Sequence, residues 1–304
     1  MYDAIVIGGG PAGLQAALTL GRMHRSTLLV DSGRYRNDAA REMHNVITHD
    51  GTPPAEFRAA ARKNLAAYDT VEAVEDEVTT VSPDGSGFVV VTSRGATYAS
   101  RKVVLATGLA DTLPDIPGLQ ELWGTVAAQC PFCHGHELSG RTIAVQGGPH
   151  APRVAALLSR IAGELVVLAH DHEVSDAERA QITHLGGTVR EGLVTVVRPD
   201  GDGALVELGE ETVRVDGFFV TATYSQAAPF AEQLGLALLP DGCIEVDAFG
   251  RTSLTGVLAG GDLAHEATLP MSMAAVVRAT AAGQLAGAVA VQELVEEELA
   301  AAAS

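Results

Sequence analysis

The residues of this chain with the clearest capacity for chemistry are Cys130, Cys133 and His134, in the stretch Cys-Pro-Phe-Cys-His. A Cys-x-x-Cys pair can be redox-active, can bind zinc or can be incidental. Zinc in structural sites takes four ligands, and a cluster in which His134 and His136 follow the pair is too tight for the common spacings. Redox chemistry is therefore the favoured prediction and no metal is assigned, with zinc as the alternative.

The histidine next to the pair gives it a base. A thiol with an ordinary pKa of about 8.5 is mostly protonated at neutral pH, so it needs a base or a positive neighbour. His134 can take the proton and, as an imidazolium, stabilise the thiolate. A packing or helix-capping role is the alternative for this residue. His136 and Glu137 are candidates to support it. The remaining cysteine, Cys243, is predicted to be a small buried apolar residue.

The N-terminus carries a nucleotide-binding pattern that would position this chemistry. An apolar strand from Asp3 to Ile7 leads into Gly8-Gly9-Gly10-Pro11-Ala12-Gly13, and a helical pattern follows. Glycines at the G-x-G-x-x-G positions let the backbone approach a pyrophosphate, which the helix N-terminus attracts. A second strand from Thr27 to Val30 ends in Asp31, which is placed to accept hydrogen bonds from a ribose. The sequence therefore predicts a dinucleotide site here.

The remaining segments alternate strands and helices. A second strand-turn-helix pattern runs from Thr142 through Gln146-Gly147-Gly148 to Leu158, and its second strand is 165–168. The other expected elements are a helix from 52 to about 68, a small antiparallel sheet of strands 71–81, 88–92 and 97–99, a buried strand 102–105, a linker 111–119, strands near 192–197, 204–208 and 218–221, a strand ending at Asp262, a helix 272–294 and a solvated, fraying helix end over 296–304.

Composition limits the class of protein. The chain has 304 residues, enough for about two domains, and a net charge of −18, which argues against a nucleic acid or an anionic membrane as partner. No apolar run is long enough for a spanning helix, and the N-terminus shows no signal-peptide pattern, so a cytoplasmic location is expected. Three cysteines are too few for a disulfide framework.

In order and spacing, Gly8–Gly13, Ala106-Thr107-Gly108 and Gly260-Gly261-Asp262 resemble the motifs of two-domain flavoprotein disulfide reductases. A Cys-x-x-Cys shortly after the linker resembles the low-molecular-weight thioredoxin reductases. The resemblance implies an α/β fold of two Rossmann-like, three-layer domains. It places a discontinuous FAD-binding domain at 1–112 and 242–304, and an inserted NAD(P)-binding-like domain, with the cysteine pair, at 115–240.

The resemblance also implies the residues that bind FAD. The three glycines of the first motif would hold the pyrophosphate, Asp31 the adenosine ribose and Asp262 the ribityl chain, and Asn45 would approach the flavin. The full set implied is Gly8, Gly10, Pro11, Ala12, Gly13, Asp31, Ser32, Asn45, Val78, Ala106, Thr107, Gly108, Gly261 and Asp262.

Three departures from the reductase pattern bear on function. Gln146 replaces the first glycine of the second nucleotide motif, where a side chain would crowd a pyrophosphate. Asp171 stands where the reductases have arginines for the 2′-phosphate of NADPH. Losing two charge-assisted hydrogen bonds of about 1.5–3 kcal/mol each would weaken NADPH binding by roughly 10²- to 10⁴-fold. His134 replaces the acid that follows the second cysteine, and Cys-Pro-Phe-Cys-His-Gly resembles the FAD-dependent dithiol oxidases of the gliotoxin and holomycin type.

The leading prediction is therefore a dithiol oxidase that closes a disulfide in a small molecule and passes electrons to O2, giving H2O2. In the enzymes that the chain resembles, the first cysteine exchanges with substrate and the second reduces the flavin. The resemblance therefore implies that Cys130 exchanges with substrate and that Cys133 reduces the flavin. The alternatives are a thioredoxin-disulfide reductase-like enzyme fed by NAD(P)H or another donor, and a non-catalytic flavin-binding redox sensor. The resemblance also implies a homodimer.

Overall fold

The chain forms two compact units in a computed structural model that describes residues 1–85 and 87–303. The first unit comprises Met1–Arg36, Ala55–Ala110 and Tyr224–Ser304, and the second comprises Asn37–Pro54 and Asp111–Thr223. The chain thus returns to the first unit at Tyr224, earlier than the expected residue 242. The reason is that Phe230, Ala231 and Leu236 are buried in the core of the first unit.

The first unit is built on a seven-stranded sheet with the order β3-β2-β1-β6-β5-β4, and β18 also pairs with β6. Strands β1, β2, β3, β6 and β18 are parallel, whereas β4, β5 and β6 pair antiparallel. Its elements are β1 (Tyr2–Ile7), α1 (Pro11–Arg22), β2 (Thr27–Asp31), α2 (Pro54–Leu65), β3 (Val71–Glu75), β4 (Val78–Asp84), β5 (Gly87–Thr92), β6 (Thr97–Leu105), α7 (Phe230–Gln233), β17 (Ile244–Glu245), β18 (Val257–Ala259), β19 (Ala264–His265) and α8 (Val276–Ala303).

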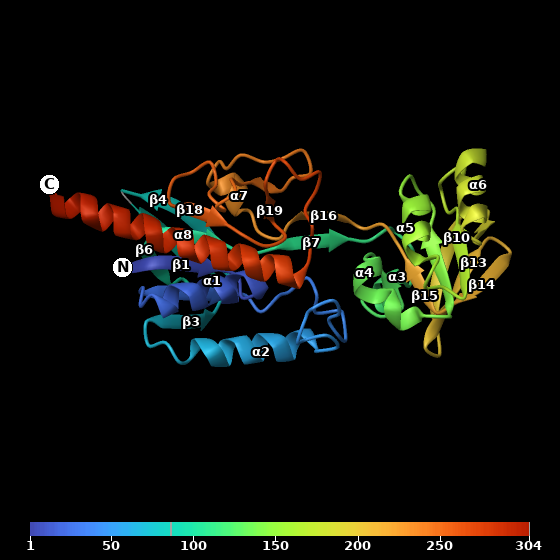
Figure 1. The fold of residues 1–304 in the computed structure, drawn as a ribbon, viewed down its shortest axis with the longest axis horizontal. Helices are drawn as coiled ribbons and strands as arrows, with labels where there is room; N and C mark the ends of the chain where they lie inside the picture. Colours follow the sequence, from blue (N-terminus) through green and yellow to red (C-terminus); the bar gives the residue numbers. More distant parts are fainter. Residues whose placement is uncertain (86, 304) are drawn as a thin grey trace. The chain divides into compact units, whose positions relative to one another are not determined.

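Alternation along the strands gives this sheet two buried faces. Ala4 and Val6 belong to a core shared with α1 and α8, whereas Ile5 and Ile7 belong to a core on the opposite face. Successive side chains of a strand point to opposite faces, so a continuous apolar run is what a sheet covered on both sides requires. Helices α1 and α8 lie side by side along one face (Figure 1).

Two features of the first unit differ from the expected elements. The expected strand 71–81 is broken at Asp76, whose carboxylate accepts hydrogen bonds from the Glu77 N–H at 2.8 Å and the Ser93 hydroxyl at 2.8 Å. Its first half, β3, joins the parallel sheet beside β2 rather than a separate antiparallel sheet. The expected strands 97–99 and 102–105 are a single strand, β6.

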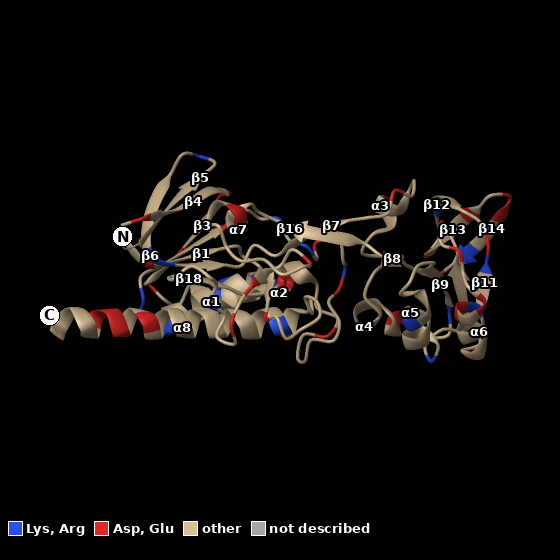
Figure 2. Ribbon diagram, turned by 90° about the horizontal axis from the view of Figure 1, so that it is seen from above, with Lys and Arg blue, Asp and Glu red and all other residues tan. Residues whose placement is uncertain are grey.

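The C-terminal helix starts later and ends later than expected. It begins at Val276 and is helical to Ala303, and residues 296–303 are exposed, as expected of a solvated helix end; Ser304 lies outside the described residues. Its acidic turn is held by basic side chains of the sheet, because Lys102 pairs with Glu297 at 2.6 Å and Arg101 with Glu298 at 2.9 Å. Figure 2 shows these acids gathered near the end of α8.

The second unit has a parallel five-stranded sheet with the order β11-β10-β9-β15-β8 and a separate antiparallel sheet, β12-β13-β14. Its elements are α3 (Leu119–Leu122), β8 (Ala127–Ala128), α4 (Pro131–His134), the 3-10 helix η1 (His136–Leu138), β9 (Thr142–Gln146), α5 (Ala151–Leu158), β10 (Glu164–Leu168), α6 (Asp176–His184), β11 (Thr188–Arg190), β12 (Val194–Asp200), β13 (Gly203–Leu208), β14 (Glu211–Val215) and β15 (Gly217–Phe219).

Two strands, β7 (Leu109–Thr112) and β16 (Thr223–Gln226), pair with each other where the chain passes between the units. Each unit contains parallel strands, one of which leads through a glycine turn into a helix (β1 into α1, and β9 into α5), and this is the Rossmann-like arrangement expected from the sequence. No helix among the described residues is long and apolar enough to cross a membrane.

Candidate active site

The two cysteines of the Cys-x-x-Cys motif are joined in a disulfide in the second unit. Cys130 is the N-cap of α4 and Cys133 lies within this short helix, which places their Cα atoms 5.3 Å apart. Proline at the first helical position suits the start of a helix, and the Cys133 N–H donates to the Cys130 carbonyl at 3.1 Å. Both cysteines are partly exposed. The local sequence therefore folds into a pair that can exchange between disulfide and dithiol.

His134 ends α4, directly after the second cysteine. Both of its ring nitrogens are buried and have no hydrogen-bond partner among the described residues. Burial lowers the pKa of His134 below its ordinary value; the charge of Glu137 acts against this shift and that of His44 acts with it. A neutral imidazole has one nitrogen that can accept a proton, and burial makes the resulting imidazolium less stable than in water. This burial argues against the capping alternative, since the ring caps no backbone group in this part of the chain.

The glycine-rich turn of the first unit forms a cradle at the start of α1. A Cβ at Gly8, where φ is 111°, would lie 2.3 Å from the Ala106 carbonyl oxygen, and one at Gly13 would lie 1.8 Å from the Gly8 carbonyl oxygen. Gly10 is the N-cap and faces open space. The helix then begins at Pro11, with no side-chain cap and no acid in its first turn. Its first N–H groups are thus available to an anion.

Two further segments lie against this turn. Ala106 and Ala12 are buried together with Ala279 of α8. A Cβ at Gly261, where φ is 100°, would be 3.1 Å from the Cβ of Ala12, so the loop that carries Asp262 also approaches the turn. Thr107 and Gly108 follow Ala106 at the end of β6 and are partly exposed. The structure therefore brings together the three motifs that the sequence separates widely.

The acid at the end of β2 is next to the same turn. Asp31 is 5% exposed, and a Cβ at Gly9 would collide with its carboxylate. This carboxylate accepts hydrogen bonds from the Tyr35 hydroxyl at 2.5 Å and from the Arg62 guanidinium. Ser32, the next residue, is exposed. An acid placed here can accept hydrogen bonds from ribose hydroxyls, and this contact of Asp31 stays a prediction.

The other predicted cofactor residues lie in three different environments. Asp262 is partly exposed and pairs with Arg36 at 2.9 Å. Val78 is 7% exposed and packs in the core of the first unit. Asn45 belongs by its contacts to the second unit, where it takes the left-handed region with φ of 60° and donates its N–H to Asp50 at 2.7 Å. The flavin contacts of Val78 and Asn45 stay predictions.

The residues of the first unit fit a flavin dinucleotide. The open space at Gly10 would be filled by a side chain at that position, and the uncapped start of α1 is electrostatically suited to a pyrophosphate. Asp31 and Asp262 each lie where a segment of the chain approaches the start of α1. Their carboxylates can accept hydrogen bonds from hydroxyl groups.

The corresponding strand ends of the second unit border a different cavity, of about 620 Å³. Gln146 is buried, and its side-chain oxygen accepts from the Thr221 N–H at 3.1 Å, so the side chain lies across the ends of β9 and β15. The cavity is also lined by Asp115 and Asp171, and no lysine or arginine of the described chain lines it. His170 Nδ1 accepts a hydrogen bond from the Val194 N–H at 3.2 Å, so this nitrogen cannot donate a hydrogen bond to an anion.

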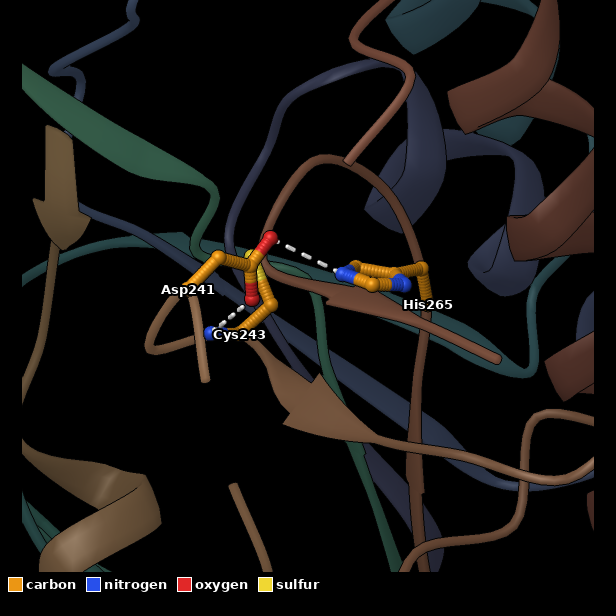
Figure 3. A group of neighbouring side chains, drawn as sticks. All are labelled: Asp241, Cys243 and His265. Atoms are coloured by element: carbon orange, nitrogen blue, oxygen red, sulfur yellow. Dashed lines mark hydrogen bonds and ion pairs between the residues drawn. The ribbon is translucent and has the colours of Figure 1, made fainter. Parts of the chain in front are cut away.

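A further polar cluster, of Asp241, Cys243 and His265, escaped the sequence reasoning (Figure 3). One oxygen of Asp241 accepts from His265 Nε2 at 2.9 Å and from the Tyr224 hydroxyl at 3.1 Å, and the other accepts from the Cys243 N–H at 3.1 Å. Cys243 is fully buried, as predicted, and burial raises its pKa to about 12. A thiol that stays protonated and a carboxylate already saturated with donors form a structural network rather than a prepared metal site.

Comparison with known proteins places these features in a family. The model of the pyridine nucleotide-disulphide oxidoreductases matches residues 2–283. The chain belongs to this family. Within it, the redox pair and the relatives below make the chain a flavin-dependent thiol:disulfide oxidoreductase.

The relatives cover nearly the whole chain. Thioredoxin reductase tcpT of Claviceps purpurea is 33% identical over 94% of this chain and 93% of its own length. Thioredoxin reductase sirT of Leptosphaeria maculans is 33% identical over 87% of each chain. The crystal structure of HlmI superposes with a TM-score of 0.91 at 34% identity, over 99% of this chain and 95% of that one. The fold class and the resemblance predicted from the sequence are confirmed.

Proposed function

We propose that this oxidoreductase is an FAD-dependent dithiol oxidase that closes a disulfide in a small-molecule dithiol and uses O2 as the electron acceptor, giving H2O2. The cavity at the strand ends of the second unit is the observation that carries the proposal. Gln146, Asp115 and Asp171 line it, without a lysine or arginine among the described residues. A nicotinamide dinucleotide phosphate carries several negative charges, which such a lining repels.

The residues of the redox pair account for the exchange. A substrate thiolate attacks Cys130 Sγ, so the Cys130–Cys133 bond breaks and Cys133 leaves as a thiolate. The second substrate thiolate then attacks the mixed disulfide, which closes the product disulfide and frees Cys130 as a thiolate. His134 accepts a thiol proton in this sequence, for which its buried, unpartnered nitrogens suit it.

The flavin would be held by the first unit. The glycine turn from Gly8 to Gly13 would bind the pyrophosphate of FAD, Asp31 the adenosine ribose and Asp262 the ribityl chain. When bound, the flavin supplies a two-electron acceptor for the enzyme dithiol and a donor for O2. The homodimer and the cytoplasmic location implied above are part of the same proposal, and light scattering of the purified protein tests the dimer.

Anaerobic absorbance of the purified protein tests the function directly. The flavin band is titrated with NADPH, NADH and dithiothreitol in turn, and the sample is then exposed to air. The oxidase proposal expects bleaching by the dithiol alone, with rapid recovery and one H2O2 per turnover in air. Bleaching by a nicotinamide would overturn it and favour the thioredoxin-disulfide reductase-like alternative, which the names of the relatives also suggest.

A third result would identify the redox sensor. In that case the dithiol bleaches the flavin, but the reduced protein persists in air and turns over slowly with every donor. The rate of reoxidation therefore separates this alternative from the oxidase.

A further inference from the structure

Each of the two carboxylates beside the glycine turn of the first unit is paired with an arginine. Arg36 donates to Asp262 at 2.9 Å, and the side chains of both residues are 22% exposed. The Arg62 guanidinium donates to the nearly buried carboxylate of Asp31. Neither arginine belongs to a nucleotide-binding motif of the sequence. The structure therefore adds two cations to a site at which the sequence marks only glycines and acids.

Both arginines have a second contact, with a tyrosine of the same unit. The Arg36 guanidinium lies 5.9 Å from the centre of the Tyr224 ring, and the Tyr224 hydroxyl donates to Asp241 at 3.1 Å. Arg62, in the last turn of α2, donates to the Tyr35 hydroxyl at 2.7 Å. Each guanidinium is thus held between an acid and a tyrosine, which limits the freedom of its side chain.

These pairs set the charge of a site that has to accept an anion. The pyrophosphate of a flavin dinucleotide carries about two negative charges, whereas the start of a helix supplies only about half of a positive charge. Two carboxylates without cations next to that start would repel the anion, in a chain whose net charge is already −18. One arginine for each acid removes this repulsion. A carboxylate offers about four acceptor positions, so an acid paired with an arginine can still accept from a ribose or ribityl hydroxyl.

The second unit lacks such cations at the equivalent point of its own sheet. Asp171 follows β10 closely, as Asp31 ends β2, and it lines the cavity there together with Asp115. No lysine or arginine among the described residues lines that cavity. Acids thus lie near strand ends in both units, and the arginines paired with them distinguish the first.

We propose that Arg36 and Arg62 are positioning residues of the flavin site. By neutralising the carboxylates with which they pair, they allow the start of α1 to accept an anionic dinucleotide. The inference rests on the proposed FAD site, and it holds whether the enzyme is an oxidase or a reductase. Because the two arginines act by charge, they strengthen the binding of a flavin that carries a pyrophosphate and add little for a flavin that has no phosphate.

Flavin titration of the full-length protein, after removal of any bound flavin, tests the proposal. Binding of FAD and of riboflavin, which has the ribityl chain but no phosphate, is followed by flavin fluorescence. Arg36→Gln and Arg62→Gln are each expected to weaken FAD binding about tenfold or more, and to change riboflavin binding by less than about twofold. Arg22→Gln is the matched control and should leave both affinities unchanged. Arg22 is exposed and also donates to a tyrosine hydroxyl, but it lies at the opposite end of α1.

Further variants separate the charge of Arg36 from a purely structural role. If the charge matters, Asp262→Asn restores the balance, and the double variant Arg36→Gln/Asp262→Asn binds FAD more tightly than Arg36→Gln alone. Arg36→Lys keeps the charge and is expected to bind FAD within about threefold of the wild type. Unchanged FAD affinity in both glutamine variants, or equal losses for FAD and riboflavin in Arg36→Gln, would overturn the proposal.

Failure of the proposed cofactor site gives a different result. A wild-type protein that binds neither flavin discards the FAD site and the role of the arginines together, whereas wild-type binding with unaffected variants discards that role alone. The titration contains no dithiol, nicotinamide or O2, so its result does not depend on the electron acceptor. Circular dichroism shows whether each variant is folded; should Arg36→Gln not fold, Arg62→Gln and Arg36→Lys still decide.

Discussion

At the scale of single residues, the surroundings of each of the three cysteines decide whether it can take part in thiol–disulfide exchange. Cys130 and Cys133 are joined and partly exposed, whereas Cys243 is fully buried with a pKa raised to about 12 by burial first and the charge of Asp241 second. A thiol held protonated and away from solvent neither attacks nor is attacked.

Replacing the second cysteine therefore should stop electron transfer to the flavin. In Cys133→Ser, dithiothreitol is expected to leave the flavin band unchanged on the timescale on which the wild type bleaches completely. Stopped-flow absorbance at the flavin maximum measures this. Cys243→Ser is the matched control and keeps the wild-type rate. Wild-type bleaching in Cys133→Ser would contradict the assignment of this thiol.

The Asp241–His265 pair predicts a pH dependence of stability. Burial opposes ionisation of Asp241, but hydrogen bonds from the Cys243 N–H, His265 and Tyr224 outweigh it and lower its pKa to about 2. Because the pKa of Asp241 is depressed in the folded state, ionised Asp241 contributes its full stabilisation above the pKa of the unfolded chain, about 3.9. This contribution is lost as the pH falls toward 2.

Asp241→Asn is expected to lower the free energy of unfolding by about 1–3 kcal/mol at pH 7, because the hydrogen bonds to a charged carboxylate are replaced by hydrogen bonds to a neutral amide. The loss should shrink as the pH falls from 5 to 3. Urea unfolding at several pH values measures both. A difference between the two proteins that is constant with pH would contradict the shifted pKa.

At the scale of elements, α8 is fixed to the sheet by a buried charge. The Lys102 side chain is 3% exposed and pairs with Glu293 at 2.9 Å and with Glu297 at 2.6 Å. Glu293 also pairs with Arg251 at 2.8 Å. Removing one partner of a buried charge is costly, because the remaining ion keeps its desolvation penalty.

Glu293→Gln is expected to lower the free energy of unfolding by about 1–3 kcal/mol at neutral pH. Thermal and urea unfolding measure the change. Glu296→Gln lies on the same helix, but its side chain is exposed and makes no ion pair among the described residues, so it should change stability by less than about 0.5 kcal/mol. Equal effects of the two variants would show that Lys102 does not depend on Glu293.

The elements also show what the sequence could predict. The glycine turn, Asp31 and the Cys-x-x-Cys were predictable because each is a local pattern with a fixed physical requirement. The break at Asp76 depends on a hydrogen bond from Ser93, which is 17 residues further along the chain. The Asp241–His265 pair and the approach of His44 to Glu137 join residues far apart in the chain, and no local pattern marks them.

At the scale of the whole molecule, the proposed function makes the cavity of the second unit the feature that would select the electron donor. This unit keeps a parallel sheet with strand, glycine turn and helix, but its cavity is acidic. The fold is therefore compatible with a nicotinamide donor, whereas our proposal expects the acidic side chains to oppose its binding.

Asp171→Arg should partly reverse this opposition. NADPH affinity is expected to rise at least about tenfold, because one charge-assisted hydrogen bond is worth roughly 1.5–3 kcal/mol. Titration calorimetry measures the affinity. Glu173→Arg makes the same change of charge at an exposed position nearby that does not line the cavity, and it should have a much smaller effect. An equal gain in both variants would indicate a general effect of charge.

The pairing of β7 with β16 has a consequence for the history of such a chain. Adjacent strands of a sheet lie about 4.8 Å apart, so the main segment of the second unit departs and returns through neighbouring positions. A short turn could replace that segment and leave every strand of the first unit's sheet in its order. A gene could therefore gain, lose or exchange this module without changing the strand order of the first unit's sheet. One ancestral scaffold could in this way be served by different electron donors.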